Sequence, residues 1–551
     1  MKWFPLCNYT HYSLGVGFSK PKELTEKCSK NRYIACGIAD YKSLSGAVAF
    51  YKACIENQIK PIIGCSFDGF TLFAKNKQGW LDLIELVSSL DADKNIDVKL
   101  LNFVCSRKNL ICVGINPASS PVTGDDFYLK SELFFNTYYV DREDADLHRI
   151  ILCSGMKTTM RKVYDAIRAG KNVQHQEFFE SSDFFLKDNS EIAEFLLQDP
   201  ESVNLFEDIY NKCETYDILN KPMLPKFPTP NGESEEEYLK EICRQGWRKF
   251  LISSTKVSSE ERKQVYLNRF LEEFEVIKNA NLFGYFLIVQ DIIKYVTENG
   301  WLAGPGRGSA GGCLISYLIG ITKIDPIEFD LLFSRFYNAG RNTEDHISLP
   351  DIDVDVPANK RDEVIAYLKT KYGNENVSQM LTFGRLQGRS AIKEVLRVRE
   401  ACGFSEMNEI TKNIPDEAAI SDQLQEMDDE DRSIIRWSLI NKPDELRDFC
   451  FINDSGELDG DYAEYFKEAI AIEGTFKTQG KHAAGIVISA NNLNKVCPMV
   501  NQKNGDEKIA GLEMEDLEAL GHVKLDILGL TLLDKLMYIE KINKGIIGRI
   551  N

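Results

Sequence analysis

Residues 349–356 read Leu-Pro-Asp-Ile-Asp-Val-Asp-Val, so acidic and apolar side chains alternate from residue 351 onward. This alternation predicts a β-strand with Asp351, Asp353 and Asp355 on one face and buried apolar side chains on the other. Same-face neighbours on a strand lie roughly 7 Å apart, so the three carboxylates repel one another unless water or cations neutralise them. The segment therefore predicts either a Mg²⁺ site or an acidic edge strand that faces solvent.

A glycine-rich stretch lies upstream and reads Gly-Pro-Gly-Arg-Gly-Ser-Ala-Gly-Gly over residues 304–312. We interpret it as a turn between a short strand starting at Trp301 and a helix over residues 313–319. Glycines let the backbone approach a ligand closely, and free N–H groups at a helix start favour phosphate. Arg307 adds a charged donor and Ser309 a hydroxyl. Such a loop is a tight turn more often than a phosphate site, but a downstream Asp-x-Asp strand favours nucleotidyl transfer.

A third candidate element reads Gly-His-Val-Lys-Leu-Asp-Ile-Leu-Gly over residues 521–529. Alternation places Lys524 and Asp526 on one face of a predicted strand. The two side chains form either an ion pair within the strand or a functional pair. In the functional interpretation Asp526 is a further metal ligand and Lys524 reaches a phosphate.

In this order, Gly-Pro-Gly-Arg-Gly-Ser, Pro-Asp-Ile-Asp-Val-Asp and Val-Lys-Leu-Asp-Ile-Leu-Gly-Leu resemble motifs of the C-family replicative DNA polymerases. The most similar type is the alpha subunit of bacterial DNA polymerase III. Further similar segments lie in both halves of the chain, at residues 60–65, 224–230, 325–336, 377–384 and 480–488. The resemblance therefore covers nearly the whole sequence.

The resemblance implies a role for each matching residue. It makes Asp351, Asp353 and Asp526 the catalytic aspartates, which hold two Mg²⁺ ions. Asp355 has a counterpart in the motif but is not one of these three. The residues expected to bind the incoming nucleotide are Arg307, Gly308, Ser309, Arg335 and Lys524.

The net charge of −18 is unfavourable for DNA binding unless basic residues gather locally, because phosphate contacts need Lys and Arg. One such stretch exists, since Arg389, Lys393 and Arg397 are spaced to form a stripe on one face of a helix. The stripe either follows a DNA backbone or is a solvated basic face. The full set of expected DNA-binding residues is Arg385, Arg389, Lys393, Arg397, Lys477 and Lys481.

In the family, the N-terminal region is a polymerase-and-histidinol-phosphatase (PHP) domain, which holds a metal cluster in many members. Its opening His-x-His motif is replaced here by Cys7 and Tyr9, while His11 falls two positions late. Of the later ligands Asp40 is kept, but Ser66 stands where an acidic residue is expected. One aspartate cannot hold a trinuclear cluster, so we expect no metal, no hydrolytic or proofreading activity, and a scaffolding role.

The resemblance implies an α/β multidomain chain with a polymerase-beta-type nucleotidyltransferase palm and a helical thumb. The expected domains are a PHP-like region at 1–221, palm segments at 222–382 and 482–531, a thumb at 383–481, and the start of the fingers or a partner-contacting tail at 532–551.

The expected function is template-directed DNA synthesis, in which nucleotides pass from dNTPs to the primer 3′-hydroxyl of a primer–template DNA. Family members continue far beyond the third aspartate, so we expect a second chain to supply the fingers and clamp-binding regions, and a sliding clamp to act through that chain. A split polymerase, an expressed fragment and a degenerate relative are all open. The alternative function is a non-catalytic DNA-binding or assembly subunit.

The sequence predicts a cytoplasmic protein of a bacterial cell, or of a host cell if phage-encoded. The first residues lack the apolar core of a signal peptide, and no apolar run has membrane-spanning length. The 14 cysteines show no Cys-x-x-Cys pair and are expected to be reduced thiols.

Overall fold

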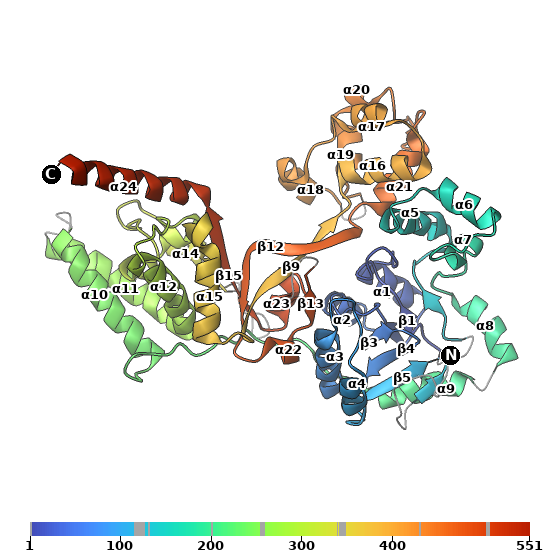
Figure 1. Cartoon of the computed structure of the whole chain (residues 1–551), viewed down its shortest axis with the longest axis horizontal. Coiled ribbons are helices and arrows are strands. Elements are labelled where there is room, and N and C mark those ends of the chain that lie inside the picture. Colours follow the sequence, from blue (N-terminus) through green and yellow to red (C-terminus); the bar gives the residue numbers. More distant parts are fainter. Residues whose placement is uncertain are drawn as a thin grey trace. The chain divides into compact units, whose positions relative to one another are not determined.

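The computed structural model describes the chain except at residues 1–2, 115–126, 131–132, 200–201, 254–258, 339, 341–348, 429–430, 503–506 and 551; side chains at 252–253 and 544–550 are also outside the description. Its contacts divide the chain into two compact units, labelled by element in Figure 1. Unit 1 comprises Met1–Ile218 and Thr382–Gly480, and unit 2 comprises Leu219–Leu381 and Lys481–Asn551. Each unit has a hydrophobic core of its own.

The first part of unit 1 is built on a five-stranded mixed sheet in the order β2-β3-β4-β5-β6, and β1 pairs with β7 beside it. The strands are β1 (Cys7–Asn8), β2 (Ala35–Ile38), β3 (Lys60–Phe67), β4 (Phe70–Ala74), β5 (Leu110–Gly114), β6 (Phe127–Leu129) and β7 (Asn136–Thr137). The helices are α1 (Pro21–Lys30), α2 (Ala47–Glu56), α3 (Lys77–Ser89), α4 (Val98–Cys105), α5 (Ala145–Gly155), α6 (Met160–Arg168), α7 (Glu177–Glu180), α8 (Asn189–Gln198) and α9 (Ser202–Lys212). Strands β2 to β5 are buried almost throughout, as their short apolar runs require.

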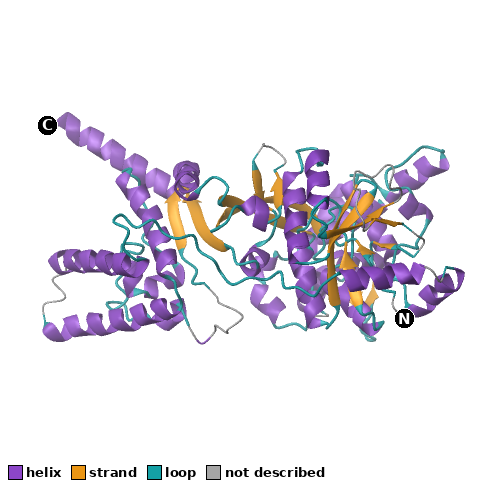
Figure 2. Ribbon diagram, turned by 90° about the horizontal axis from the view of Figure 1, so that it is seen from below, coloured by secondary structure: helices purple, strands orange, loops and turns teal. Residues whose placement is uncertain are grey.

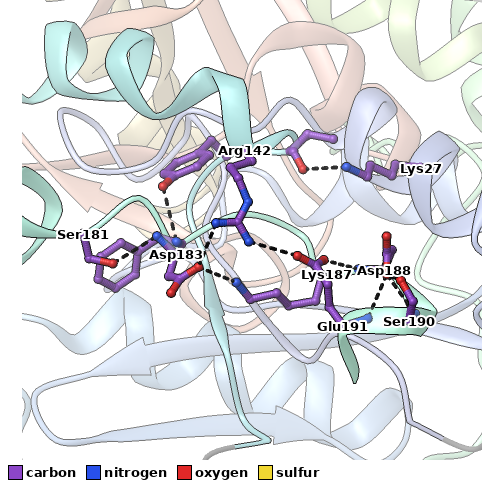
Figure 3. A network of polar contacts seen from close by, with 11 residues as sticks. Lys27, Arg142, Ser181, Asp183, Lys187, Asp188, Ser190 and Glu191 are labelled. Carbon is purple, nitrogen blue, oxygen red and sulfur yellow. Dashed lines mark hydrogen bonds and ion pairs between the residues drawn. The ribbon is translucent and has the colours of Figure 1, made fainter. Parts of the chain in front are cut away.

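A polar network fixes the start of α8 (Figure 3). Arg142 lies 3.0 Å from Glu191 and 3.5 Å from Asp183, which also pairs with Lys187 at 3.1 Å. Asp188 caps the helix by accepting hydrogen bonds from the backbone N–H groups of the first turn. Such a cap stabilises a helix by about 1 kcal/mol, whereas exposed ion pairs contribute little.

The second part of unit 1 is mainly helical, as expected for residues 383–481. Its elements are α16 (Gly388–Arg399), α17 (Phe404–Thr411), α18 (Ser421–Gln425), α19 (Ile434–Asn441), α20 (Pro443–Leu446), β10 (Phe451–Ile452), β11 (Leu458–Asp459) and α21 (Ala463–Ile472). Helix α16 packs on α5 and α21, and one core contains side chains from all three helices. The helical segment thus shares its core with the N-terminal part of the chain.

Unit 2 contains most of a six-stranded sheet in the order β13-β14-β9-β12-β15-β8. The strands are β8 (Asp353–Pro357), β9 (Val377–Arg385), β12 (Phe476–Ile488), β13 (Met499–Asn501), β14 (Lys508–Ala510) and β15 (Val523–Leu530). Strands β9 and β12 begin or end in unit 1, because the helical segment is inserted between them. Figure 2 shows the strands in orange and the helices in purple.

The helices of unit 2 are α10 (Glu235–Ser253), α11 (Glu260–Asn279), α12 (Phe283–Glu298), α13 (Leu314–Leu318), α14 (Phe333–Phe336), α15 (Arg361–Tyr372), α22 (Leu493–Val496), α23 (Met514–Ala519) and α24 (Thr531–Ile550). Helix α12 begins Phe-Gly-Tyr-Phe-Leu-Ile-Val and is buried along most of its length, because it is apolar on nearly every side. It packs against α15 and β8, so the core lies directly beneath the strand that carries Asp353.

The glycine-rich stretch departs from the prediction at its start only. Residues 301–307 form no regular element, so the predicted strand at Trp301 is wrong. The predicted turn is present, with φ values of +88° at Gly306 and +66° at Gly308 that suit glycine. A 3₁₀ turn, η2 (Gly308–Gly312), then precedes the short helix α13, where the sequence predicts a helix.

No single helix within the described residues combines the length and apolar character needed to cross a bilayer. The pair α11 and α12 meets these two criteria together, but the helices are bent by 112° at their junction. All 14 cysteines lie in the described ranges and are free thiols, in agreement with the expectation.

Candidate active site

Strands β8 and β15 bring the predicted acidic residues together. The strands are parallel neighbours, and their register places Asp526 opposite Asp353. Asp351 lies just before β8. Carboxylate oxygens of Asp351, Asp353 and Asp526 all lie within 4.8 Å of one another. Three hard oxygen donors at this spacing are the ligand type that Mg²⁺ prefers.

The electrostatics of this cluster favour a cation. Partial burial, followed by the negative charges of Asp353 and Asp526, raises the pKa of Asp351. Oδ1 of Asp526 is buried and accepts no hydrogen bond from any described residue. A carboxylate cluster of this kind gains stability when a divalent ion neutralises it.

Arg307 provides positive charge at the cluster. Its Nε lies 3.0 Å from Oδ2 of Asp353 and 3.6 Å from Oδ1 of Asp355. Burial raises the pKa of Asp355, and Arg307 opposes that rise. Asp355 lies outside the group of three neighbouring carboxylates.

Lys524 provides a second positive charge. Its Nζ lies 2.7 Å from Oδ2 of Asp526, so the two residues form the ion pair that strand alternation allows. The side chains of Lys524 and Asp526 are largely buried. Arg307 and Lys524 are therefore the counter-charges of the carboxylates in this structure.

The remaining predicted nucleotide-binding residues are exposed. Gly308 and Ser309 lie on η2, and Arg335 lies on α14, which packs against η2. One expectation is wrong here. The backbone N–H groups of Leu314 and Ile315, at the start of α13, donate to the buried carboxylate of Glu273 at 3.0 Å each. These two groups are consequently not free to bind phosphate.

Tyr285 on α12 is a neighbour of the site that the sequence analysis missed. It is buried, and burial together with the carboxylates of Asp351, Asp526 and Asp353 raises its pKa. The phenol therefore stays neutral beneath the acidic cluster. An apolar helix with one tyrosine gives no sequence signal for such a position.

The stripe on α16 has protein partners at each predicted position. Arg389 donates to the carbonyl oxygen of Ile414, and Lys393 donates to Asn408 at 2.8 Å. Arg397 pairs with Glu394 and donates to the carbonyl oxygen of Thr158 at 3.0 Å. DNA binding by this stripe would have to share or replace these contacts.

Of the other predicted DNA-binding residues, Arg385 ends β9, Lys477 lies at the start of β12 and Lys481 lies within β12. Arg385 lies 5.1 Å from the ring centre of Phe476, and Lys477 pairs with Glu394. Lys481 is exposed, and its positive charge lowers the pKa of Lys369 after the larger effect of burial.

Most N-terminal positions that match PHP metal ligands carry residues other than the family's ligands, and only Asp40 is kept. The Tyr9 hydroxyl lies 2.9 Å from the Ser66 hydroxyl, and burial raises the pKa of the Cys7 thiol to about 11. Asp40 accepts hydrogen bonds from Thr10 and Ser13, and burial raises its pKa to about 6. Tyr9 and Ser66 are thus hydrogen-bonded to each other, and Asp40 is hydrogen-bonded by Thr10 and Ser13.

Comparison with known proteins gives the family. The family described as "Bacterial DNA polymerase III alpha NTPase domain" matches residues 237–529, more than half of the chain, and the PHP domain matches residues 6–117. The chain is 30% identical to DNA polymerase III subunit alpha of Buchnera aphidicola over 98% of its length and 49% of that relative. It is 29% identical to the Bacillus subtilis subunit over 96% of its length and 48% of that relative.

The chain belongs to the bacterial DNA polymerase III alpha family. It spans about half the length of the curated relatives it matches. The PHP and polymerase regions are therefore those of a nucleotidyltransferase family, and the α/β multidomain prediction is confirmed.

Proposed function

We propose that this chain carries the catalytic palm of a DNA polymerase, which transfers nucleotides from dNTPs to a primer 3′-hydroxyl under the direction of a template. The observation that carries the proposal is the convergence of Asp351, Asp353 and Asp526, with Arg307 and Lys524 beside them. Phosphoryl transfer is achieved mainly by positioning and charge neutralisation, so acids for metal ions and bases for phosphates are the required groups.

The carboxylates fit two Mg²⁺ ions. Their oxygens are hard donors, they repel one another, and Oδ1 of Asp526 has no hydrogen-bond donor among the described residues. Asp351, Asp353 and Asp526 would hold the ions. Bound Mg²⁺ lowers the pKa of an attacking hydroxyl and neutralises charge on the triphosphate and the leaving pyrophosphate.

The basic and glycine residues of this chain would bind and orient the triphosphate. Arg307 and Lys524 neutralise the carboxylates in the free chain, and both can turn to phosphate oxygens once cations replace them. Gly308 adds a turn whose backbone a phosphate can approach, Ser309 adds a hydroxyl donor, and Arg335 adds a charge from the adjacent helix.

We propose that the fingers and clamp-binding regions come from a C-terminal partner chain. Helix α24 carries a set of exposed apolar side chains suited to packing. These are Leu532, Leu536, Tyr538, Ile539 and Ile542, with Leu532 61% and Tyr538 66% exposed. Exposed apolar side chains in this number on one helix are typical of a binding surface.

We also propose that the PHP-like region is a metal-free scaffold. The hydrogen bond between Tyr9 and Ser66 and the protonated thiol of Cys7 support this proposal. Metal analysis of the purified Asp526→Asn variant tests it, with less than one transition metal ion per chain expected after dialysis. A stoichiometric ion retained by this variant would contradict the proposal.

Primer extension with Mg²⁺ and dNTPs tests the polymerase. It compares the chain alone, the chain with its C-terminal partner, Asp353→Ala and the control Asp291→Asn. Asp291 is a buried carboxylate of unit 2 that bonds Tyr367 and Lys371 on α15. We expect extension only with the partner, loss in Asp353→Ala, and retention in Asp291→Asn.

The competing function is a non-catalytic assembly or DNA-binding subunit. The ion pairs of Arg307 and Lys524 favour it, because they neutralise the carboxylates without a metal. Partner binding without extension in any mixture would support this function and contradict the polymerase.

A further inference from the structure

A buried ion pair on α11 joins Arg269 and Glu273. It contacts the chain just after η2 and just before α14, the two elements that carry predicted nucleotide-binding residues. Glu273 is 0% exposed and accepts a hydrogen bond from Nε of Arg269 at 2.6 Å. The same carboxylate accepts from the backbone N–H groups of Leu314 and Ile315, and it lies 3.3 Å from the thiol of Cys313. It therefore holds the chain immediately after the glycine-rich loop.

Arg269 extends the pair to a second element. Its terminal nitrogen donates to the carbonyl oxygen of Gly312 at 2.8 Å and to that of Leu331 at 3.0 Å. Gly312 is the last residue of η2, and Leu331 lies two residues before α14, which carries Arg335. One guanidinium group thus joins the two elements that carry the exposed residues predicted to bind the triphosphate.

The other end of the loop is attached to the acidic strand. The backbone N–H of Gly304 donates to the carbonyl oxygen of Asp355 at 3.0 Å. A Cβ at Gly304 would lie 2.6 Å from Cβ of Asp355, so no larger residue fits this approach. The exposed turn at Gly308 and Ser309 is consequently held between β8 on one side and the Arg269–Glu273 pair on the other.

A buried ion pair contributes little net free energy to the stability of a fold. Removing two charges from water costs several kcal/mol, and well-packed apolar residues often stabilise a protein as well or better. The geometry of an ion pair, however, fixes several backbone groups at once, as the four backbone contacts of Arg269 and Glu273 do here. Fixed geometry is what a phosphate-binding turn needs.

We propose that Arg269 and Glu273 are positioning residues for the nucleotide phosphates. They hold the η2 turn and α14 in one arrangement, so that Ser309 and Arg335 can reach the same triphosphate beside the aspartates. Neither residue touches the reacting atoms. The inference rests on the proposed polymerase function, and it adds residues that act through the loop.

The test uses the full chain with four substitutions. Glu273→Gln keeps the shape of the side chain and removes its charge. Arg269→Ala removes the guanidinium group, and Arg269→Lys keeps the charge but cannot bond Glu273, Gly312 and Leu331 together. The matched control is Asp291→Asn, which breaks a buried ion pair of the same unit with Lys371 on α15.

Hydrogen–deuterium exchange provides a readout that needs no catalysis. In Glu273→Gln and Arg269→Ala we expect amides of residues 308–315 to exchange on the order of tenfold faster than in the wild type. Asp291→Asn should leave these amides unchanged at a similar loss of thermal stability. Equal exchange of residues 308–315 in the control and in the Glu273 variant would overturn the proposal.

Primer extension with the partner chain provides the second readout. We expect the KM for dNTP to rise on the order of tenfold in Glu273→Gln, Arg269→Lys and Arg269→Ala, with kcat changed less than about twofold. A fall in kcat by the factor expected for KM, with KM itself unchanged, would overturn the positioning role. A KM in Arg269→Lys equal to that of the wild type would also overturn it. If the wild type extends no primer, the polymerase proposal fails, and the exchange experiment still decides whether the pair holds the loop.

Discussion

At the residue scale, His11, which lies two positions after the expected metal motif, is used for packing. It is 7% exposed, and its ring stacks on Phe476 with 4.0 Å between ring centres. Burial, with smaller effects from Lys20 and Arg385, lowers its pKa to about 3. The neutral imidazole is therefore the form that fits this site.

His11 makes unit 1 sensitive to acid. An unfolded histidine binds a proton near pH 6.5, while the folded one resists protonation down to about pH 3. The unfolded state then holds more protons, so the free energy of unfolding falls as pH falls between these values, by up to about 1.4 kcal/mol per pH unit. We expect His11→Phe, which keeps a ring on Phe476, to lose this part of the pH dependence.

Urea unfolding followed at a series of pH values measures the effect. The difference in the free energy of unfolding between the wild type and His11→Phe should be constant above about pH 7 and should change steadily below about pH 6.5. His148→Phe should remove a further part of the pH dependence, because burial lowers the pKa of His148 to about 4. If the free energy of unfolding of His11→Phe depends on pH as strongly as that of the wild type, protonation of His11 does not cause the acid sensitivity.

At the element scale, the basic residues of α16 allow a structural role to be distinguished from a DNA-binding role by experiment. Arg397 binds Thr158 and Glu394 within unit 1, so its loss removes contacts and leaves the nearly buried Glu394 with Lys477 alone. We expect Arg397→Ala to lower the stability of unit 1 by about 1–3 kcal/mol. Lys481→Ala, at an exposed position, should change stability by less than about 0.5 kcal/mol.

DNA binding measured at two salt concentrations completes this comparison. A residue that contacts phosphate reduces the salt dependence of binding when it is removed, by about one unit of the logarithmic slope. If Arg397→Ala flattens the slope and leaves stability unchanged, the helix is a DNA-binding element and its internal contacts are incidental.

The elements of the candidate site differ in how far the sequence could predict them. Period-two alternation gave the faces of β8 and β15, because side chains on a strand point to opposite sides in turn. It did not give their pairing, since the register between strands far apart in the chain depends on the whole sheet. The functional interpretation of residues 521–529 makes Asp526 a further metal ligand, and the family resemblance implies that it joins Asp351 and Asp353.

The Arg269–Glu273 pair shows why other parts of the candidate site could not be predicted from the sequence. Its i,i+4 spacing is readable from the sequence and normally indicates a solvent-exposed helix pair worth a few tenths of a kcal/mol. Its burial and its contacts with Gly312 and Leu331 come from packing between elements. The hydrogen bonds from Leu314 and Ile315 to Glu273 explain why the helix start after the loop is not available to phosphate, in contrast to the prediction.

At the scale of the whole molecule, the two units have separate cores and only one of them contains the acidic cluster. Separate cores predict two unfolding transitions in calorimetry. The repelling carboxylates of Asp351, Asp353 and Asp526 belong to unit 2, so a divalent ion should stabilise that unit. The transition of unit 1 should not respond.

We therefore expect Mg²⁺ to raise the melting temperature of one transition only. A ligand that binds the folded state stabilises it by about 2.7 kcal/mol at a concentration 100 times its Kd. Asp526→Asn should abolish the shift, which is measured as the difference in melting temperature with and without Mg²⁺ for each protein, because the substitution also leaves the largely buried Lys524 without its carboxylate partner. The transition of unit 1 is identified independently, as the one that His11→Phe alters at acid pH. A Mg²⁺ shift in that transition, or an undiminished shift in Asp526→Asn, would place the metal site elsewhere and remove the main support for a catalytic palm.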